Sequence, residues 1–284
     1  MRLTQTYSAK QFGIFRVVLA MYMCIHFLLL VGFAPEMWSN AGMLADEKLN
    51  LTYGVFPNLL NTFDTPFQTQ VFVIAMAMLS ALLAIGIGRR WVALLLWLGW
   101  VMLFNRNNFI SNPSMPFVGW LLLVMAVVPH GESFALLPKK KADWQMPRIL
   151  LYGAWIIMAL SYTISGIDKL NAPSWCDGSG MRHLLENPLA RNSDLRTMLL
   201  NAPEVVLQIF SYIVLAIEIT FLPLCLFAKG RKWAWTLMVA LHLSILVVVD
   251  FADLTIGMMM IHVFTYDPSW FRKMRTEKKA LYKA

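Results

Sequence analysis

Several ionisable side chains lie within or next to long apolar segments of the sequence, where a charge is costly. Glu218, His242 and His262 fall inside apolar segments, and Lys169 follows closely on one that ends at Ile167. Ionisable residues in membrane-spanning segments usually face the protein interior and mark functional sites. An amine at the edge of an apolar bundle loses hydration, which favours the neutral form that acts as a base. Lys169 is therefore the first candidate for a catalytic role.

Each of these residues also has a structural interpretation. Asp168 next to Lys169 favours the charged amine, and lysines at a membrane interface commonly anchor the chain to lipid. Glu218 and His242 fall near the middle of consecutive antiparallel segments, so they could form a hydrogen bond, which would lower the cost of burying both. That bond would either tie two helices together or belong to a substrate or proton pathway. Arg16 lies one turn inside a segment and is expected to extend its guanidinium toward water.

The histidines and cysteines raise the question of a metal or haem site. His26 and His242 could face each other as haem ligands, but no segment carries two histidines spaced for a second haem. Cys176 and His183 are seven residues apart in a loop without a second cysteine, which disfavours zinc. Cys176 is also the one cysteine outside the apolar segments, so no disulfide framework is indicated. The sequence therefore predicts neither a metal site nor a disulfide.

The elements that must position these residues are eight apolar segments, each a candidate membrane helix. The chain is 58% hydrophobic, and its 284 residues leave little length outside these segments. We therefore predict an all-α, polytopic membrane helical bundle that forms a single domain over residues 1–284. The segments are 12–33, 68–88, 91–104, 115–129, 147–167, 205–228, 233–249 and 254–266.

Lysine and arginine are distributed unequally between alternate loops. With the N-terminus in the cytoplasm, 18 of the 24 fall on the inner side and six on the outer side, the asymmetry that orients membrane proteins. Both termini are therefore predicted to be cytoplasmic, and Lys169 to lie on the outer side. The net charge of +8 reflects inner loops such as 139–141 facing anionic lipid headgroups, and it does not indicate a nucleic-acid partner.

Three segments, 91–104, 115–129 and 254–266, are shorter than the roughly 20 residues of a perpendicular span. Each could extend into flanking polar residues and cross the bilayer. Alternatively, 91–104 and 115–129 form one re-entrant hairpin, which removes two crossings and leaves the sidedness of the other loops unchanged. Both alternatives stay open on the sequence.

Two predicted outer loops, about 34–66 and 168–204, are long enough to fold. Met181–Leu185 and Leu195–Leu200 are predicted as short helical turns, and Asn192, Ser193 or Asp194 could cap the second. Loops of this length are usually ordered only when they cover something. We therefore expect a lid over an outward-facing cavity.

Five short motifs give the chain a resemblance to a known superfamily. They are NRNNFISNP (105–113), SGIDKLNAPSWCDGSGMRHLL (165–185), EITFLPLCLF (218–227), ALHLSI (240–245) and MMMIHVFTYDPSW (258–270). Together and in this order they resemble the vitamin K-dependent γ-carboxylase superfamily and its bacterial HTTM (horizontally transferred transmembrane) relatives. The resemblance covers most of the chain from the second apolar segment onward.

The resemblance implies a helical membrane domain whose active site opens to the extracytoplasmic side. In the carboxylases a lysine followed by leucine deprotonates a reduced quinone, and Lys169 occupies that position in this sequence. A reduced quinone is accordingly the implied cofactor. On this hypothesis Glu218 and His242 act with Lys169 in catalysis. Pocket and substrate contacts are expected from Asn107, Asn108, Asn112, Trp175, Cys176 and His262.

The chain departs from the carboxylases at two places. Pro113 follows Asn112 where the carboxylases carry a functional histidine after paired asparagines, and the large lumenal region that holds a propeptide is missing. Carboxylation of a tethered protein is therefore not expected. Some short bacterial relatives instead take part in maturing a secreted peptide toxin. Cys176 beside Trp175 would suit contact with a cysteine-bearing peptide, or it is an incidental thiol.

Two functions follow from these observations. The first is a multi-pass enzyme of the bacterial cytoplasmic membrane that modifies a small secreted peptide or a lipid-like substrate at the outer face. The second is a non-catalytic membrane partner, either a scaffold for a small soluble protein or an immunity factor against a peptide toxin. A transporter is disfavoured, because inverted repeats and a pair of Gly- or Pro-broken helices are missing. The two hypotheses differ in whether Lys169, Glu218 and His242 share one cavity.

Overall fold

The computed structural model describes residues 7–137 and 141–271, and in these residues it contains helices and no β-strand. This confirms the predicted all-α class. The predicted cytoplasmic termini and most of the basic run 139–141 lie outside the described residues. The long helices are α1 (Ala9–Leu30), α3 (Pro66–Ile85), α4 (Arg89–Arg106), α5 (Met115–Val127), α6 (Arg148–Leu170), α10 (Glu204–Cys225), α11 (Ala228–Val248) and α12 (Ala252–Thr265).

Shorter helical pieces lie in the loops between them. They are α2 (Ala34–Trp38), α7 (Pro173–Cys176), α8 (Gly180–Glu186), α9 (Asp194–Leu200) and four 3-10 turns, η1 (Glu47–Leu49), η2 (Leu59–Asn61), η3 (Asn108–Ile110) and η4 (Pro268–Phe271). The two turns predicted in loop 168–204 correspond to α8 and α9. Ser193 caps α9, because its side chain accepts a hydrogen bond from the Arg196 backbone.

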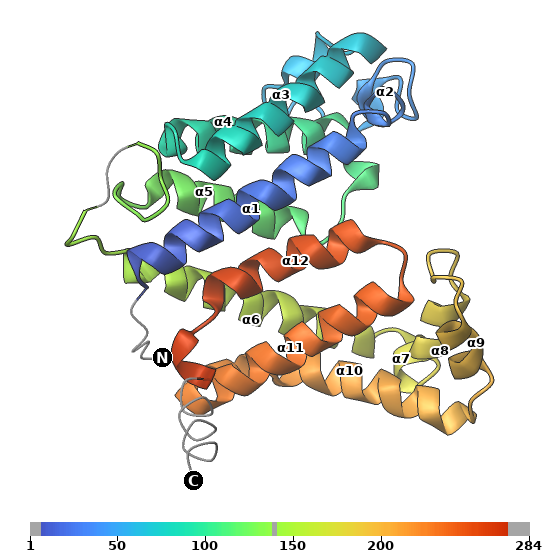
Figure 1. Ribbon diagram of the computed structural model, residues 1–284. Helices are drawn as coiled ribbons and strands as arrows, with labels where there is room; N and C mark the ends of the chain where they lie inside the picture. Colours follow the sequence, from blue (N-terminus) through green and yellow to red (C-terminus); the bar gives the residue numbers. More distant parts are fainter. Residues whose placement is uncertain (1–6, 138–140, 272–284) are drawn as a thin grey trace. The chain divides into compact units, whose positions relative to one another are not determined.

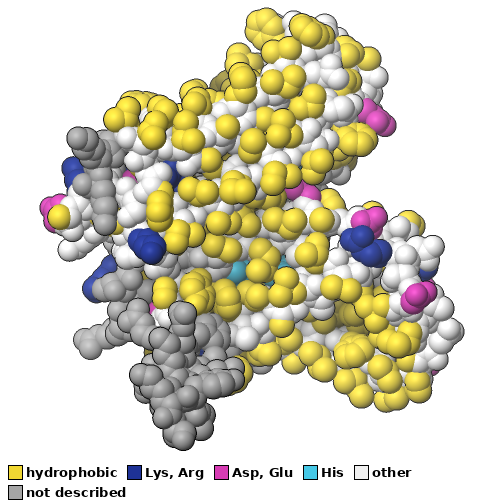
Figure 2. All heavy atoms as spheres, viewed as in Figure 1, with side chains coloured by type: hydrophobic (Ala, Val, Ile, Leu, Met, Phe, Trp, Pro, Cys, Tyr) yellow, Lys and Arg dark blue, Asp and Glu magenta, His cyan; other side chains and the backbone are white. Residues whose placement is uncertain are grey.

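Each of the eight predicted apolar segments contains one long helix. Within the described residues, α1, α3, α6, α10 and α11 are long and apolar enough to cross a membrane. α4 has 18 residues and carries three arginines, whereas α5 and α12 have 13 and 14 residues. Hydrophobic side chains cover much of the viewed surface in Figure 2. Exposed apolar side chains on long helices indicate a lipid-facing surface.

The chain divides into two compact units. Of the described residues, the N-terminal unit comprises 7–147 and 256–261, and the C-terminal unit comprises 148–255 and 262–271. In the N-terminal unit α1 packs on α3, α3 on α4, and α4 on α5. α3 begins with a capping box, in which Thr65 and Gln68 bond each other's backbone, and it ends at Gly86 in the left-handed conformation.

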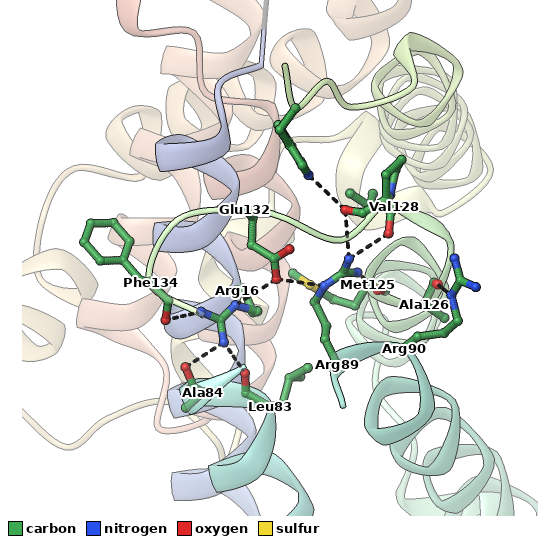
Figure 3. A network of polar contacts seen from close by, with 12 residues as sticks. Arg16, Leu83, Ala84, Arg89, Arg90, Met125, Ala126, Val128, Glu132 and Phe134 are labelled. Atoms are coloured by element: carbon green, nitrogen blue, oxygen red, sulfur yellow. Dashed lines mark hydrogen bonds and ion pairs between the residues drawn. The ribbon is translucent and has the colours of Figure 1, made fainter. Parts of the chain in front are cut away.

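A buried ionic cluster holds the N-terminal unit together at one end (Figure 3). Glu132 Oε1 lies 2.8 Å from Arg89 Nε and 3.5 Å from Arg16 Nε, and all three side chains are at most 1% exposed. The expectation that Arg16 extends to water was therefore wrong. Its guanidinium donates instead to the Leu83 and Ala84 carbonyls at the C-terminal end of α3. The Leu83 carbonyl also accepts from the Gly86 amide at the helix cap, and the buried arginine adds a donor to these last carbonyls of α3.

Arg89 has the same role at the end of α5. Its guanidinium donates to the carbonyl oxygens of Met125, Val128 and Pro129. Glu132 thus pairs with two arginines, each of which also binds the end of a helix (Figure 3). The cluster fixes α1, α3, the start of α4 and the end of α5 relative to one another.

In the C-terminal unit α6 packs on α10, and α10 packs on α11. The short helices α7 and α8 contact α10, and α9 contacts α8 (Figure 1). Ser211 of α10 attaches them, because its hydroxyl donates to the Gly178 carbonyl and accepts from the Met181 amide. Gly178 has φ +84, and a side chain at this position would meet Gln208. Glycine is therefore required where α7 turns into α8.

Candidate functional site

The contact between α6 and α10 is close and polar. A Cβ atom on Gly166 of α6 would lie 3.0 Å from Glu218 Cβ of α10, so the glycine lets the two helices approach. The Thr163 hydroxyl donates to the Glu218 carbonyl (3.3 Å) and accepts from the Leu222 amide (3.1 Å). Pro223 of α10 has no amide hydrogen. Helix α10 is therefore bound to α6 by side-chain hydrogen bonds where its own ladder is weakest.

Lys169 and Glu218 form the central pair of the site. Lys169 Nζ lies 2.6 Å from Glu218 Oε2 and 2.8 Å from Ser165 Oγ, which is one helical turn earlier. The side chains are 22% and 10% exposed. The Trp175 ring centroid lies 5.3 Å from Nζ, within cation–π range. Glu218 and His242 bind different partners, because the Glu218 carboxylate accepts from Lys169 and His242 Nε2 bonds to the Tyr162 hydroxyl.

A cavity of about 820 Å³ lies next to this pair within the C-terminal unit. Since α6 ends at Leu170, beside Glu218, it leaves uncovered the part of α10 from Glu218 back to Glu204, which is about 21 Å of helix. That part of α10, α11 and the loop helices line the cavity, which is open on one side. Its lining is Lys169, Trp175, Met181, Leu184, Asn187, Leu189, Ala190, Leu195, Leu199, Phe210, Ile213, Val214, Ile217, Glu218, Leu237, Ala240, Leu241, Ser244, Ile245, Val247, Val248, Val249, Phe251 and Leu254.

The lining confirms that loop 168–204 covers a cavity. It is almost entirely hydrocarbon, and its charged members are Lys169 and Glu218. Hydrogen bonds within the loop also hold it, such as the bond from the Ser179 amide to the Asp177 carboxylate. These hydrogen bonds lower the pKa of the Asp177 carboxyl below its ordinary value. The cavity therefore combines a large apolar volume with one ion pair.

The two C-terminal histidines meet at a tyrosine of α6. Tyr162 Oη lies 2.9 Å from His242 Nε2 and 2.8 Å from His262 Nε2. The Trp235 indole donates to the His262 carbonyl (2.8 Å). Tyr162 is buried, with 4% of its surface exposed, and both histidines are buried as well. None of these residues is among the described residues that line the cavity.

The sequence-predicted catalytic residues are therefore divided between two neighbouring clusters of the C-terminal unit. Lys169 and Glu218 share the cavity, whereas His242 joins His262 at Tyr162. Tyr162 and Ser165 were missed by sequence analysis. Both lie on the face of α6 that carries Lys169, at spacings of seven and four residues, which helical periodicity could have indicated. The pairing of Tyr162 with histidines 80 and 100 residues away has no signal in the sequence.

The other predicted contact residues lie in different places. Trp175 lines the cavity, but the exposed Cys176 does not, and its thiol donates to the Leu170 carbonyl (3.1 Å). The three asparagines belong to the N-terminal unit, and none is among the described residues lining the cavity. Asn107 donates to the Met37 carbonyl, and Asn112 accepts from Ser114. Their role in substrate binding stays a prediction.

The arrangement is suited to proton transfer. An amine and a carboxylate in direct contact can exchange a proton with each other and with a third group that enters the cavity. Within residues 7–137 and 141–271, no three His, Cys, Asp or Glu side chains are grouped to hold a metal ion. The direct contact between Lys169 and Glu218 suits the pair to acid–base chemistry next to an apolar cavity.

The close approach of α6 and α10 leads to a test by glycine substitution. Gly166→Ala should lower the free energy of unfolding by about 1–3 kcal/mol, because its Cβ would lie 2.9–3.0 Å from Ile219 and Glu218 atoms. The matched control is Gly32→Ala, where a Cβ meets nothing within 4 Å and a change within about 0.5 kcal/mol is expected. Thermal unfolding in detergent measures both. Equal effects would mean that α6 and α10 are not tightly packed at Gly166.

Comparison with known proteins identifies one match. A family model described as the HTTM domain matches residues 4–270. Searches of curated proteins and of solved structures found no match. The matched range includes both clusters of the C-terminal unit and nearly all of the described chain.

Proposed function

This chain belongs to the HTTM family, and we propose that it is an integral membrane enzyme in which Lys169 and Glu218 transfer a proton to or from a substrate. The observation that carries the proposal is a lysine–carboxylate pair, Nζ to Oε2 2.6 Å, at a cavity lined otherwise by hydrocarbon. Ionisable groups in such surroundings are costly to maintain and are typical of functional sites.

The apolar surroundings supply a way to generate the base. When a substrate displaces water from the cavity, both charges of the pair lose hydration. Transfer of the proton from Lys169 Nζ to Glu218 Oε2 then leaves a neutral amine and a neutral carboxylic acid. Before the transfer, Ser165 Oγ and the Trp175 ring hold the ammonium in place. After it, the amine is the base and Glu218 holds the proton.

The lining favours a lipid-like substrate over a peptide backbone. Amide groups of an extended peptide would find few partners among the Leu, Ile, Val and Phe side chains of the cavity, and each unpaired amide costs several kcal/mol, roughly 2–7. A hydrocarbon chain has no such groups. The volume of about 820 Å³ is in the range of small-molecule sites. We therefore propose a substrate or cofactor whose apolar part fills the cavity and whose polar end reaches Lys169.

The reduced quinone implied by the carboxylase resemblance has this character. Its isoprenoid tail would lie against the walls from α10 and α11, and its hydroxyl would reach the Lys169–Glu218 pair. Such a group would supply an acidic hydroxyl proton and redox chemistry when bound. We also propose that the cavity opens to the outer side of the membrane, as the distribution of Lys and Arg predicts. A small soluble partner protein is a further part of the proposal.

The test compares strains of the native host. We expect a deletion strain to lose a modified lipid or secreted peptide, and Lys169→Ala to reduce the same product at least about 100-fold, the usual effect of removing a general acid or base. Glu218→Gln should lower it as well. Lys48→Ala, at an exposed lysine of the N-terminal unit, is the matched control and should behave as wild type. Mass spectrometry of lipid extracts and of secreted peptides measures the products.

Membrane abundance of each variant has to be equal before the products are compared. If Lys169→Ala then matches wild type while the deletion does not, Lys169 has no chemical role. That result would favour the non-catalytic scaffold or immunity function.

A further inference from the structure

The loop between α1 and α3 exposes an uncharged apolar surface. Residues 49–63 contain no Asp, Glu, Lys, Arg or His. Alternate side chains of their first part, Leu49, Leu51, Tyr53 and Val55, point outward, with Leu51 82% and Val55 76% exposed. Leu59 and Phe63 continue the exposed set. A surface loop of ordinary composition would carry charges here, so this loop is built for an environment other than water.

The loop is ordered, because its asparagines bind the C-terminal end of α4. Asn58 Nδ2 donates to the Met102 carbonyl (2.9 Å), and Asn50 Nδ2 donates to the Asn105 carbonyl (2.5 Å). Arg106, the last residue of α4, donates to the Leu44 carbonyl (2.8 Å) earlier in the same loop. The side chains of Asn50 and Asn58 are therefore turned inward, toward carbonyls near the end of α4. The apolar side chains are left outward by the same arrangement.

Several backbone amides of the loop are satisfied by its own turns. The amides of Tyr53 and Val55 bond to the carbonyls of Asn50 and Thr52, and those of Asn61 and Thr62 bond to Asn58 and Leu59. The Leu60 amide bonds to the Asn58 side chain. Non-helical backbone can enter the boundary of a bilayer only when its polar groups have such internal partners.

We infer that the surface formed by Leu49, Leu51, Tyr53, Val55, Leu59 and Phe63 inserts into the interfacial layer of the lipid bilayer. The loop joins α1 to α3, both long enough to span a membrane, and the residues next to its two ends also expose apolar side chains, those of Leu29, Phe33 and Phe67. Both ends of the loop are therefore attached to candidate membrane spans. A partner dissolved in water would find no charge to pair with on this surface, whereas lipid requires none. Exposed Asp46 and Lys48 mark where the loop returns to water.

The proposal depends on the membrane position of α1 and α3 and not on the chemistry of Lys169. It can be tested in the full-length chain with a nitroxide label. Cys24, Cys176 and Cys225 are replaced, and a label is placed at Leu51→Cys or, as the matched control, at Lys48→Cys. The protein is reconstituted into vesicles of phosphatidylcholine and phosphatidylglycerol. Collision with oxygen, which partitions into lipid, is compared with collision with a water-soluble nickel chelate by power saturation.

We expect the label at residue 51 to collide with oxygen and to be shielded from the nickel chelate, and the label at residue 48 to show the reverse. Equal access of the chelate to both labels would overturn the proposal, because the surface would then face water. Exclusion of both reagents at residue 51, with spin–spin broadening, would also overturn it and identify a second copy of the chain as the occupant.

Discussion

Replacing Glu132 by glutamine should lower the free energy of unfolding by about 3–5 kcal/mol, the usual cost of breaking a buried ion pair. The substitution keeps the size of the side chain and removes the charge shared by Arg16 and Arg89. Both guanidiniums would keep their carbonyl acceptors but would lie buried without a counter-charge. The loss is large because the buried guanidiniums of Arg16 and Arg89 regain water when α1, α3 and α5 separate.

The measurement is unfolding in detergent followed by tryptophan fluorescence. The matched control is Glu186→Gln, which removes the carboxylate of a half-exposed pair with Arg182 and should change stability by less than about 1 kcal/mol. A similar, small change in both variants would show that the carbonyl bonds alone hold the two arginines. The cluster in Figure 3 would then be stable without the charge of Glu132.

Replacing Tyr162 by phenylalanine should also destabilise the chain strongly. The hydroxyl is the shared partner of His242 Nε2 and His262 Nε2. A buried polar atom left without its partner costs about 1–3 kcal/mol, so the loss of both bonds should lower the free energy of unfolding by roughly 2–6 kcal/mol. The matched control is Tyr212→Phe, where an exposed hydroxyl donates one bond to the Cys176 carbonyl. If both variants unfold alike, the histidines do not depend on Tyr162.

The same cluster predicts the tautomers of the two histidines. His262 Nδ1 is buried without a partner, so a hydrogen there would be an unsatisfied donor. His262 should therefore carry its proton on Nε2 and donate to Tyr162, whose hydroxyl then donates to His242 Nε2. Nitrogen chemical shifts of the two imidazoles distinguish these tautomers directly. A proton on Nδ1 of His262 would contradict the assignment.

The sequence by itself determined the helices of this protein. Hydrophobic runs predicted eight segments, and each corresponds to one long helix. Local signals mark some helix ends, such as Gly86 after α3 and Ser193 before the loop helix α9. It also indicated Lys169 at the end of a helix and a loop, 168–204, that covers a cavity. These features depend on residues within a few turns of one another, so composition and spacing are sufficient to predict them.

Only the tertiary structure decided which polar groups meet. Glu218 pairs with Lys169, 49 residues away, rather than with His242. Arg16 is buried against Glu132 rather than extended to water. Such pairings depend on the rotation and axial shift of one packed helix against another, and a shift of one residue turns a side chain by about 100°. Many arrangements place the same apolar faces inward, so the hydrophobic pattern alone does not select the partners of the few polar groups.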